Sequence, residues 1–116
     1  MNKVIYCITT VKKWEHAKRK GEYWDKSLDN EGFIHCSYQF QLLRVANIHF
    51  KGISDLLILC IKRSKLNCKV IDEDLYNLNE LYPHIYGPIN INSILEIIPF
   101  PCEQNGNFNL PKKIEI

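Results

Sequence analysis

The sequence predicts an α+β fold in which small antiparallel sheets are split apart and flanked by two helices. Helix-like segments come early in the chain, whereas strand-like segments fill most of its second half. A doubly wound fold would alternate strands and helices more regularly, so this order favours helices segregated beside the sheets. At 116 residues the chain suits one compact domain, and no repeat or linker divides residues 1–116.

The first strand and the first helix are expected at residues 3–9 and 11–20. β-branched and aromatic residues dominate the first of these segments, as is typical of a strand. Thr9 or Thr10 can cap the helix, because a hydroxyl accepts a hydrogen bond from an amide of the first turn. A basic run followed by Gly21 is typical of a helix end.

Residues 22–31 are expected to form a loop, because Asp, Ser and Asn mark this segment. A short strand is expected at residues 33–36, and Ser37 is placed to cap the helix that follows. That helix is expected at residues 39–50, where apolar residues recur on one face before Gly52 ends the pattern.

The second half of the chain contains the remaining strands. The apolar residues 56–63 are the candidate for a central strand, and shorter strands are expected at residues 70–71 and 94–98. The acidic residues 72–74 are expected to lie in a solvated loop. Two prolines and a glycine predict a rigid turn within residues 83–88.

Composition and charge exclude several classes of protein. The formal net charge is +2, with 15 basic and 13 acidic residues, so nucleic acid is not indicated as a partner. No apolar run approaches the ~18 residues that cross a bilayer, and the N-terminus lacks the features of a secretory signal. Five cysteines without close pairing indicate reduced thiols, a cytoplasmic protein and no metal site.

Two short segments, residues 31–37 and 80–88, hold most of the side chains that could carry chemistry. In a strand His35 shares a face with Phe33, so it points toward the core if Phe33 does. Two imidazoles in one cleft can bind a phosphate or transfer protons. The sequence therefore predicts that the two segments converge on one cleft, which is lined by His35, Ser37, His84 and Tyr86.

Each of these residues also has a structural interpretation. A single histidine such as His35 is more often buried and hydrogen-bonded than catalytic. Ser37 can be a helix cap instead of a ligand contact, and the segment around His84 can be a plain turn. Glu80, four residues before His84, is the acidic candidate near this turn. The presence of one histidine in each segment is what favours a functional interpretation.

Five strings of the chain together resemble one protein family. In chain order they are IYCITT, WEHA, SLDNEGFIHCS, QLLRVAN and LYPHIYGPI, and they cover nearly the whole sequence. They closely resemble domain-of-unknown-function family 952, whose members are small bacterial proteins. Members of that family resemble a minimal form of the ADP-ribosyltransferase-like fold, a split pair of small antiparallel sheets with flanking helices. In that superfamily NAD lies in the cleft between the sheets.

This resemblance implies a set of site residues. The superfamily has a His or Arg on its first strand, and Cys7 stands there in this chain. The second motif resembles the segment from Gly32 to Ser37, and the third, a catalytic glutamate, matches either Glu80 or Glu73. Catalytic roles are thereby implied for His35, His84 and Glu80, and ligand-binding roles for Tyr6, Cys7, Thr9, Ser37, Tyr86 and Gly87.

The expected function is binding of a nucleotide or another phosphate-bearing small molecule in this cleft. The resemblance extends the expectation to NAD and to transfer of an ADP-ribosyl or phosphate group. The alternative is a binding or interaction module that keeps the fold without catalysis. Metal-assisted hydrolysis by His35, His84 and an acidic residue ranks last, because no metal-binding motif supports it. Neither a membrane nor a nucleic acid is an expected partner, and the sequence assigns no oligomeric state.

Overall fold

The computed structural model describes residues 4–114. The helices are α1 (Val11–Lys20), α2 (Lys26–Glu31) and α3 (Gln39–His49), with short 3-10 helices at Arg63–Lys65 and Ile91–Ser93. The strands are β1 (Val4–Thr10), β2 (Glu22–Tyr23), β3 (Ile34–His35), β4 (Leu56–Lys62), β5 (Lys69–Glu73), β6 (Tyr82–Tyr86), β7 (Ile89–Asn90) and β8 (Ile94–Phe100). Lys3, the first residue of the predicted first strand, lies outside the described residues.

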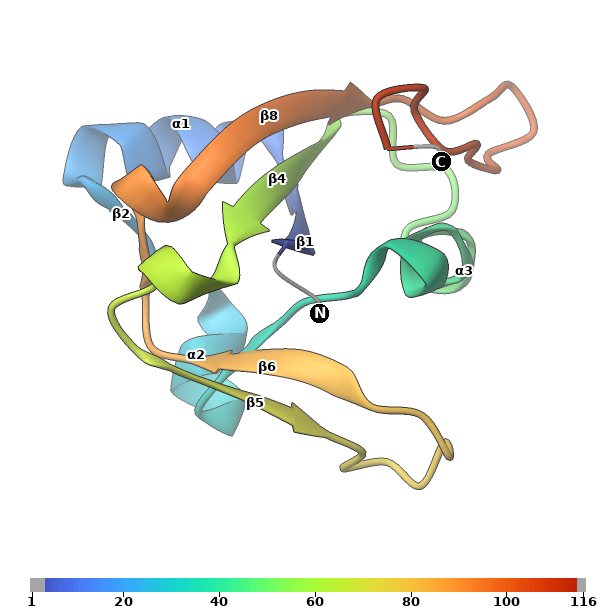
Figure 1. Ribbon diagram of the computed structural model, residues 1–116. Coiled ribbons are helices and arrows are strands. Elements are labelled where there is room, and N and C mark those ends of the chain that lie inside the picture. The colour runs from blue at the N-terminus through green and yellow to red at the C-terminus, as the bar shows by residue number, and fades with distance from the viewer. Residues whose placement is uncertain (1–3, 115–116) are drawn as a thin grey trace.

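The strands form three small sheets in the orders β1-β4-β8, β3-β6-β5 and β2-β7, and every pairing is antiparallel. In Figure 1 the β1-β4-β8 sheet lies above the β5-β6 hairpin, with α1 and α3 at its sides. The predicted α+β fold with small antiparallel sheets is therefore confirmed. The central position predicted for residues 56–63 is also confirmed, because β4 lies between β1 and β8.

Local signals place α1 as expected. The Thr10 side chain accepts a hydrogen bond from the Lys13 amide at 3.2 Å, which caps the first turn. The helix ends at Gly21, whose φ of 88° is in the left-handed region, and the Gly21 amide donates to the Ala17 carbonyl at 2.9 Å. Both signals lie within a few residues of the helix, so they can be read from the sequence alone.

The predicted loop at residues 22–31 is wrong, because it contains β2 and the short helix α2. Asp25 begins α2: its carboxylate accepts hydrogen bonds from the amide and the hydroxyl of Ser27, at 3.0 and 2.7 Å. Gly32 ends α2 in the left-handed region with a φ of 88°. The abundance of Asp, Ser and Asn thus reflects a capped helix end instead of a loop.

Ser37 does not cap α3, so that prediction is also wrong. The capping position belongs to Tyr38, whose amide donates to the side chain of Gln41 at 2.9 Å. Ser37 instead pairs with Tyr6 of β1: the two residues exchange both backbone hydrogen bonds, at 2.9 and 2.8 Å. This bridge, which we call the seam, joins β1 to the chain just after β3. The seam connects the two three-stranded sheets.

Two further predictions for the second half of the chain are corrected. Asp72 and Glu73 are not in a solvated loop, because β5 extends through both residues. Residues 82–86 are not a turn but β6, the central strand of its sheet. Pro83 has no amide proton to donate, but β3 pairs with β6 only beyond it, at His84 and Ile85.

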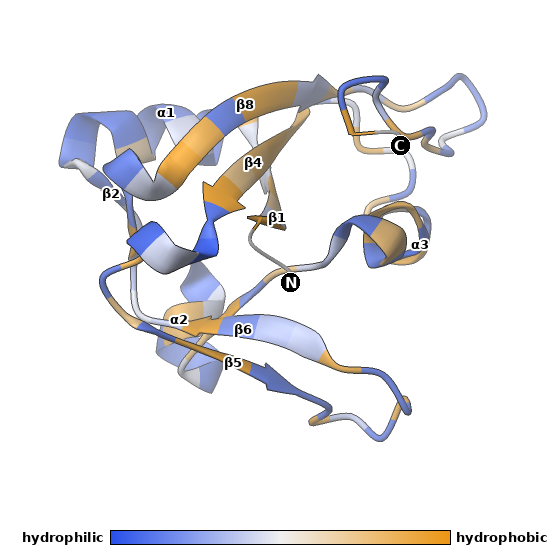
Figure 2. Cartoon of the chain, viewed as in Figure 1, coloured by the Kyte–Doolittle hydropathy of each residue, from blue (hydrophilic) through white to orange (hydrophobic). Residues whose placement is uncertain are grey.

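The β1-β4-β8 sheet separates two hydrophobic cores. Alternate residues of β4 face opposite cores: Leu59 and Ile61 face the core shared with β3, β6 and α1, whereas Ile58 and Cys60 face the core under α3. Figure 2 shows β4 as largely hydrophobic and most of α1 as hydrophilic. The burial of β4 on both faces explains why its sequence is a continuous apolar run.

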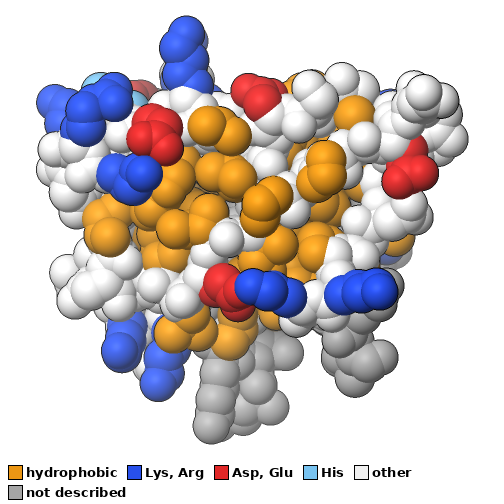
Figure 3. Space-filling model, turned by 90° about the horizontal axis from the view of Figure 1, so that it is seen from above, with side chains coloured by type: hydrophobic (Ala, Val, Ile, Leu, Met, Phe, Trp, Pro, Cys, Tyr) orange, Lys and Arg blue, Asp and Glu red, His pale blue; other side chains and the backbone are white. Residues whose placement is uncertain are grey.

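β8 forms an open edge of its sheet, and its pairing with β4 is irregular. Glu96 opposes Cys60 and Ile94 opposes Ile61, so Leu95 is left without an opposing residue in a bulge. Leu95 is exposed. Figure 3 shows hydrophobic side chains gathered on the upper face of the molecule, with charged side chains around them. Within residues 4–114, no helix is long and apolar enough to span a membrane.

Candidate functional site

His35 and His84 lie directly opposite each other where β3 pairs with β6. Their ring centroids are 5.5 Å apart, and the ring planes cross at 74°. Residues far apart in the sequence meet here because an antiparallel pair places opposing side chains on the same face of the sheet. The two histidines are therefore neighbours, as predicted, but the predicted open cleft is not found at them, because His84 is 2% exposed and Ser37 is buried at the seam.

The two histidines lie on the outer face of the β3-β6-β5 sheet. Ile34 and Cys36, which alternate with His35, are buried in the core between the sheets. The His35 side chain is 46% exposed. Phe33 shares the outer face as predicted, but it is buried against His84, with stacked ring centroids 4.1 Å apart.

His84 is hydrogen-bonded to a glutamate of the neighbouring strand. Its Nδ1–H donates to Oε1 of Glu73 at 2.9 Å, and the hydroxyl of Tyr86 donates to the same oxygen. The bonds from Tyr86 and His84 hold the pKa of Glu73 below its ordinary value, and the same contact raises the pKa of Tyr86. This bond requires a proton on Nδ1, because a carboxylate can only accept.

His35 belongs to a second cluster with the same composition. Its Nε2–H donates to Oε2 of Glu31 at 3.0 Å, and the hydroxyl of Tyr76 donates to Oε1 of Glu31 at 2.6 Å. These bonds lower the pKa of Glu31, and the bond to Glu31 raises the pKa of Tyr76 to about 12. The Tyr76 ring also stacks on His35, with centroids 6.3 Å apart.

These seven side chains form what we call the histidine surface. It consists of Glu31, Phe33, His35, Glu73, Tyr76, His84 and Tyr86. Each imidazole is paired with one carboxylate, and each carboxylate accepts from one tyrosine. A carboxylate that holds one imidazole nitrogen fixes the tautomer and leaves the other nitrogen free for proton transfer. The histidine surface is thus equipped for acid–base chemistry or for recognition of hydroxyl groups.

Tyr76 reaches the histidine surface from the loop between β5 and β6. The carboxylate of Asp74 accepts hydrogen bonds from the amides of Leu78 and Asn79, at 2.9 and 2.8 Å. Asn77 and Asn79 have φ values of 56° and 59°, in the left-handed region that asparagine tolerates. These contacts give the loop a defined shape, which positions Tyr76 over His35.

Glu80 does not join His84. It pairs with Arg44 of α3 and accepts a hydrogen bond from the side-chain amide of Gln41 at 3.0 Å. The bonds from Arg44 and Gln41 lower the pKa of Glu80. Glu80 also contributes to an open hollow of about 310 Å³, whose lining residues are Tyr38, Phe40, Asp72, Glu80 and Leu81.

The hollow belongs to the opposite face of the β5-β6 hairpin, because Asp72 alternates with Glu73. Arg63 pairs with Asp72 at 3.0 Å and donates to the hydroxyl of Tyr38 at 2.7 Å. Burial raises the pKa of Asp72, but the hydrogen bonds from Arg63 and Tyr38 outweigh burial, and the pKa is lowered. The sequence predicts that Glu80 and the two histidines line one cleft. In the structure Glu80 lines the hollow, whereas the histidines lie on the other face of the hairpin.

The other expected ligand-binding residues lie away from the histidine surface, except Tyr86. Cys7 and Thr9 are buried, and the Thr9 hydroxyl is hydrogen-bonded to the hydroxyl of Tyr23 at 2.8 Å. Tyr6 packs against the core under α3, and Ser37 pairs with it at the seam. Gly87 packs against Cys68, since a Cβ on Gly87 would lie 2.6 Å from Cβ of Cys68.

The sequence analysis missed the partners of the two histidines. Glu31 was not singled out, although it lies four residues before His35, and Tyr76 was not considered because its loop has no recognisable pattern. Glu73 was named only as an alternative catalytic glutamate and as part of an acidic run. The contact between Glu73 and His84 depends on the register of β5 against β6. Glu73 opposes Tyr82, and His84 follows Tyr82 by two residues on β6, so it is on the same face.

The electrostatic character of the histidine surface restricts its ligands. Glu31 and Glu73 both have lowered pKa values, so two carboxylates give this surface negative charge, which disfavours an anion directly over the rings. Hydroxyl groups and cations are better partners for such carboxylates. Within residues 4–114, no three His, Cys, Asp or Glu side chains are arranged to hold a metal ion.

Comparisons with known proteins give a family and a fold. A family model described as "Protein of unknown function (DUF952)" matches residues 8–97. The crystal structure of protein CC0527 from Caulobacter crescentus is similar, with a TM-score of 0.86 and 23% sequence identity over 96% of this chain and 97% of that chain. The solution NMR structure of CC0527 gives a TM-score of 0.71 and 22% identity over 90% of each chain. No curated protein matches the chain.

Proposed function

This chain belongs to the DUF952 family, and from this premise we propose that it binds a nucleotide-type small molecule at the histidine surface. One observation carries the proposal: the rings of His35 and His84 lie 5.5 Å apart, and each is hydrogen-bonded to its own glutamate. His35 is exposed whereas His84 is buried, and pairs of titratable groups held in this way are more typical of a site than of a structural contact.

Aromatic rings supply the surface for the base of such a ligand. The Tyr76 and His35 rings are both exposed and nearly parallel, with an interplanar angle of 21°. A nucleobase or nicotinamide ring can stack on such planar groups, which contributes about 1–3 kcal/mol in complexes with bases. The exposed rings therefore favour a planar ligand over an aliphatic one.

The two glutamates suit the sugar of a nucleotide better than its phosphate. An ionised carboxylate accepts hydrogen bonds, so Glu31 and Glu73 can each bind a ribose hydroxyl. A phosphate needs a cation, and Lys69 is exposed next to this surface, because it opposes Tyr86 in the sheet. The sequence predicts a phosphate between the two imidazoles. We place the phosphate toward Lys69 instead.

An ADP-ribosyltransferase-like fold and transfer from NAD are the finer part of the proposal. The two three-stranded sheets, joined only at the seam within the described residues, support this fold. Glu73 is a better candidate for the catalytic glutamate than Glu80, because Glu80 is paired with Arg44. Cys7 does not fit the superfamily's contact to NAD on the first strand, because it is buried and has no imidazole. We therefore derive no transfer step.

Isothermal titration calorimetry with NAD, ADP-ribose and adenosine monophosphate tests the proposal. The wild-type protein should bind at least one of them, and His35→Ala should weaken binding at least about ten-fold, because it removes one stacking ring and one hydrogen-bond donor. His49→Ala is the matched control, since His49 is an exposed histidine on α3. Absence of binding by the wild type, or equal loss in the two variants, would refute the proposal.

A non-enzymatic interaction module is the second candidate. Two observations favour it: Figure 3 shows hydrophobic side chains gathered on one face, and β8 carries the exposed residues Leu95 and Ile97. Exposed apolar groups of this kind mark contact surfaces when they are contiguous. Leu95→Glu should then reduce self-association in sedimentation velocity experiments without affecting ligand binding. If the chain is monomeric at all concentrations and binds a nucleotide, this candidate is excluded.

A further inference from the structure

Cys7 and Cys36 face each other across the seam. Tyr6 and Ser37 exchange both backbone hydrogen bonds in an isolated antiparallel bridge, and Cys7 and Cys36 are the residues that flank this bridge on one side. Opposing residues of an antiparallel pair have Cα atoms about 4.5–5.5 Å apart, and disulfides span Cα separations of about 4.4–6.8 Å. The backbone thus holds two cysteines at a separation that a disulfide can bridge.

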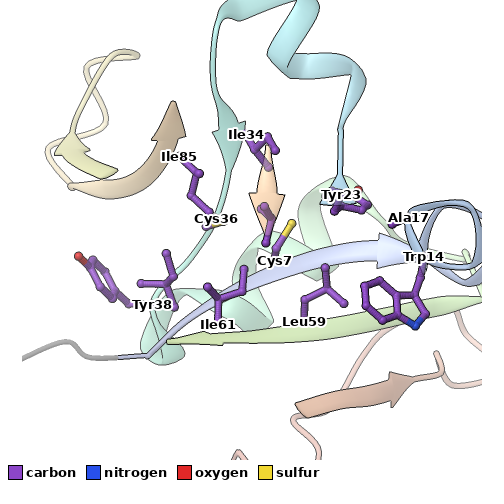
Figure 4. Close-up of a cluster of buried hydrophobic side chains, with 12 residues drawn as sticks. Cys7, Trp14, Ala17, Tyr23, Ile34, Cys36, Tyr38, Leu59, Ile61 and Ile85 are labelled. Atoms are coloured by element: carbon purple, nitrogen blue, oxygen red, sulfur yellow. The ribbon is translucent and has the colours of Figure 1, made fainter. Parts of the chain in front are cut away.

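The two side chains also point into the same core. Cys7 is 2% exposed and Cys36 is 4% exposed, and both belong to the core between the sheets. Figure 4 shows them together among the side chains of that core. The Cys36 amide donates to the Pro83 carbonyl at 3.2 Å, so the backbone of Cys36 is held by β6 while its side chain faces Cys7.

We propose that Cys7 and Cys36 are an oxidisable dithiol that forms a disulfide across the seam. This inference is independent of the proposed ligand. It goes beyond the expectation of five separate reduced thiols, because spacing along the chain does not reveal a pair that only the seam brings together. The disulfide links β1 to the residue directly after β3, and so it fastens the β1-β4-β8 sheet to the β3-β6-β5 sheet.

A hydroperoxide is the class of oxidant that balances the reaction. One thiolate attacks a peroxide oxygen of hydrogen peroxide: an S–O bond forms, the O–O bond breaks, and the departing hydroxide takes up a proton as water. The second thiolate attacks the sulfur of the resulting sulfenic acid: the S–S bond forms, the S–O bond breaks, and the departing hydroxide takes up a proton as a second water. Two thiols are oxidised to one disulfide, and one peroxide is reduced to two waters.

Burial makes this reaction slow but selective. Burial, together with the neighbouring Cys7 thiol, raises the pKa of Cys36, so little thiolate is present at neutral pH. Cys68 is a third cysteine that packs against the same core, and its thiol donates to the Pro88 carbonyl at 3.8 Å, as the Cys7 thiol does to the Ile8 carbonyl at 3.9 Å. The position of Cys7 directly opposite Cys36 therefore selects this partner over Cys68.

Peptide mapping of the folded full chain tests the proposal. Trypsin places every cysteine on a separate peptide, with Cys7 in residues 4–12, Cys36 in residues 27–44 and Cys68 in residues 66–69. After treatment with hydrogen peroxide, the intact protein should lose the mass of two hydrogen atoms. The peptides 4–12 and 27–44 should then be found linked, and dithiothreitol should reverse the link.

Variants and stability measurements complete the test. Cys68→Ala should leave the link intact, whereas Cys7→Ala and Cys36→Ala should abolish it. The oxidised protein should have a melting temperature higher by at least about 5 °C, because the disulfide restricts the unfolded chain. A link from Cys36 to Cys68 would overturn the proposal. A disulfide that forms only after the protein is unfolded would also overturn it. Because the peptide mapping uses the wild-type protein, misfolding of a variant does not affect this result.

Discussion

The ring of Phe33 lies against the imidazole of His84, with centroids 4.1 Å apart and planes inclined by only 17°. Phe33 therefore covers one face of His84, while Glu73 holds its Nδ1. A histidine fixed by both a stacked ring and a carboxylate has one orientation and one free nitrogen. Phe33 should consequently contribute to the stability of the protein, and Glu73 should determine which nitrogen of His84 carries the proton.

Phe33→Ala should lower the free energy of unfolding by about 3 kcal/mol, because it removes a buried ring and leaves a cavity beneath His84. Urea denaturation followed by circular dichroism measures this change. Phe40→Ala is the control: Phe33 is 3% exposed, whereas Phe40 is 70% exposed, and substitution at an exposed position should change stability by less than about 0.5 kcal/mol. Equal effects of the two substitutions would contradict the stacking role of Phe33.

Glu73→Gln should change the tautomer of His84. The carboxylate of Glu73 can only accept, so it requires a proton on Nδ1, whereas a glutamine amide can also donate to that nitrogen. Nitrogen-15 NMR of the imidazole should show the Nδ1–H tautomer in the wild type and a mixture in the variant. Glu80→Gln should leave His84 unchanged, because Glu80 pairs with Arg44. An unchanged tautomer in Glu73→Gln would contradict the assigned hydrogen bond.

Tyr76 should ionise near pH 12, because the bond to Glu31 raises its pKa to about 12. Ionisation of the phenol would remove the proton that it donates to the carboxylate, and this loss opposes deprotonation. NMR titration of tyrosine ring signals measures the midpoint. In Glu31→Gln the midpoint should move back toward the ordinary value of 10.0. A Tyr76 midpoint near 10 in the wild type would show that the loop does not hold the ring at Glu31.

Stability should fall on the acid side. Glu31, Glu73 and Glu80 all have pKa values lowered by hydrogen bonds in the folded protein. Their contribution is therefore fully present above the ordinary value of 4.5, and it is lost as the pH falls through the lower folded values. Urea denaturation between about pH 3 and pH 7 should show that the free energy of unfolding declines as the pH falls below the ordinary glutamate range. A free energy of unfolding that stays constant down to pH 3 would contradict the three assigned contacts.

Gly87→Ala should lower the free energy of unfolding by about 2 kcal/mol, because the new Cβ would overlap Cys68. The added Cβ would lie 2.6 Å from Cβ of Cys68, so one of the two segments would have to move. The double variant with Cys68→Gly should recover part of the loss, since it removes the atoms that overlap. Urea denaturation of the two variants measures this recovery, and its absence would show that Gly87 is required for another reason.

Local signals were sufficient for some elements and insufficient for others. The cap at Thr10 and the stop at Gly21 lie beside α1, so its bounds could be predicted from the sequence. Asp25 also caps a helix, but α2 has only six residues and no apolar stripe. The sequence therefore predicts a loop in this segment. A cap without periodicity is therefore a weak signal.

The site depends on contacts between distant segments, and this limited its prediction. The convergence of His35 and His84 could be anticipated from their unusual sequence surroundings. Whether His35 faces the core could not, because this depends on which face of β3 packs on the other sheet. Glu73 and Tyr76 reach the histidines only through the register and the loop of the β5-β6 hairpin. The single domain and the cytoplasmic location remain predictions.

The bulge at Leu95 has a consequence for how other chains can approach β8. An added strand requires an even ladder of amides and carbonyls, and the extra residue interrupts this spacing. Pro99, a few residues along the same strand, has no amide proton to offer. Edge-to-edge pairing of β8 with a strand of another molecule is thus hindered at two points. Contacts with other molecules on this side would therefore be made by side chains.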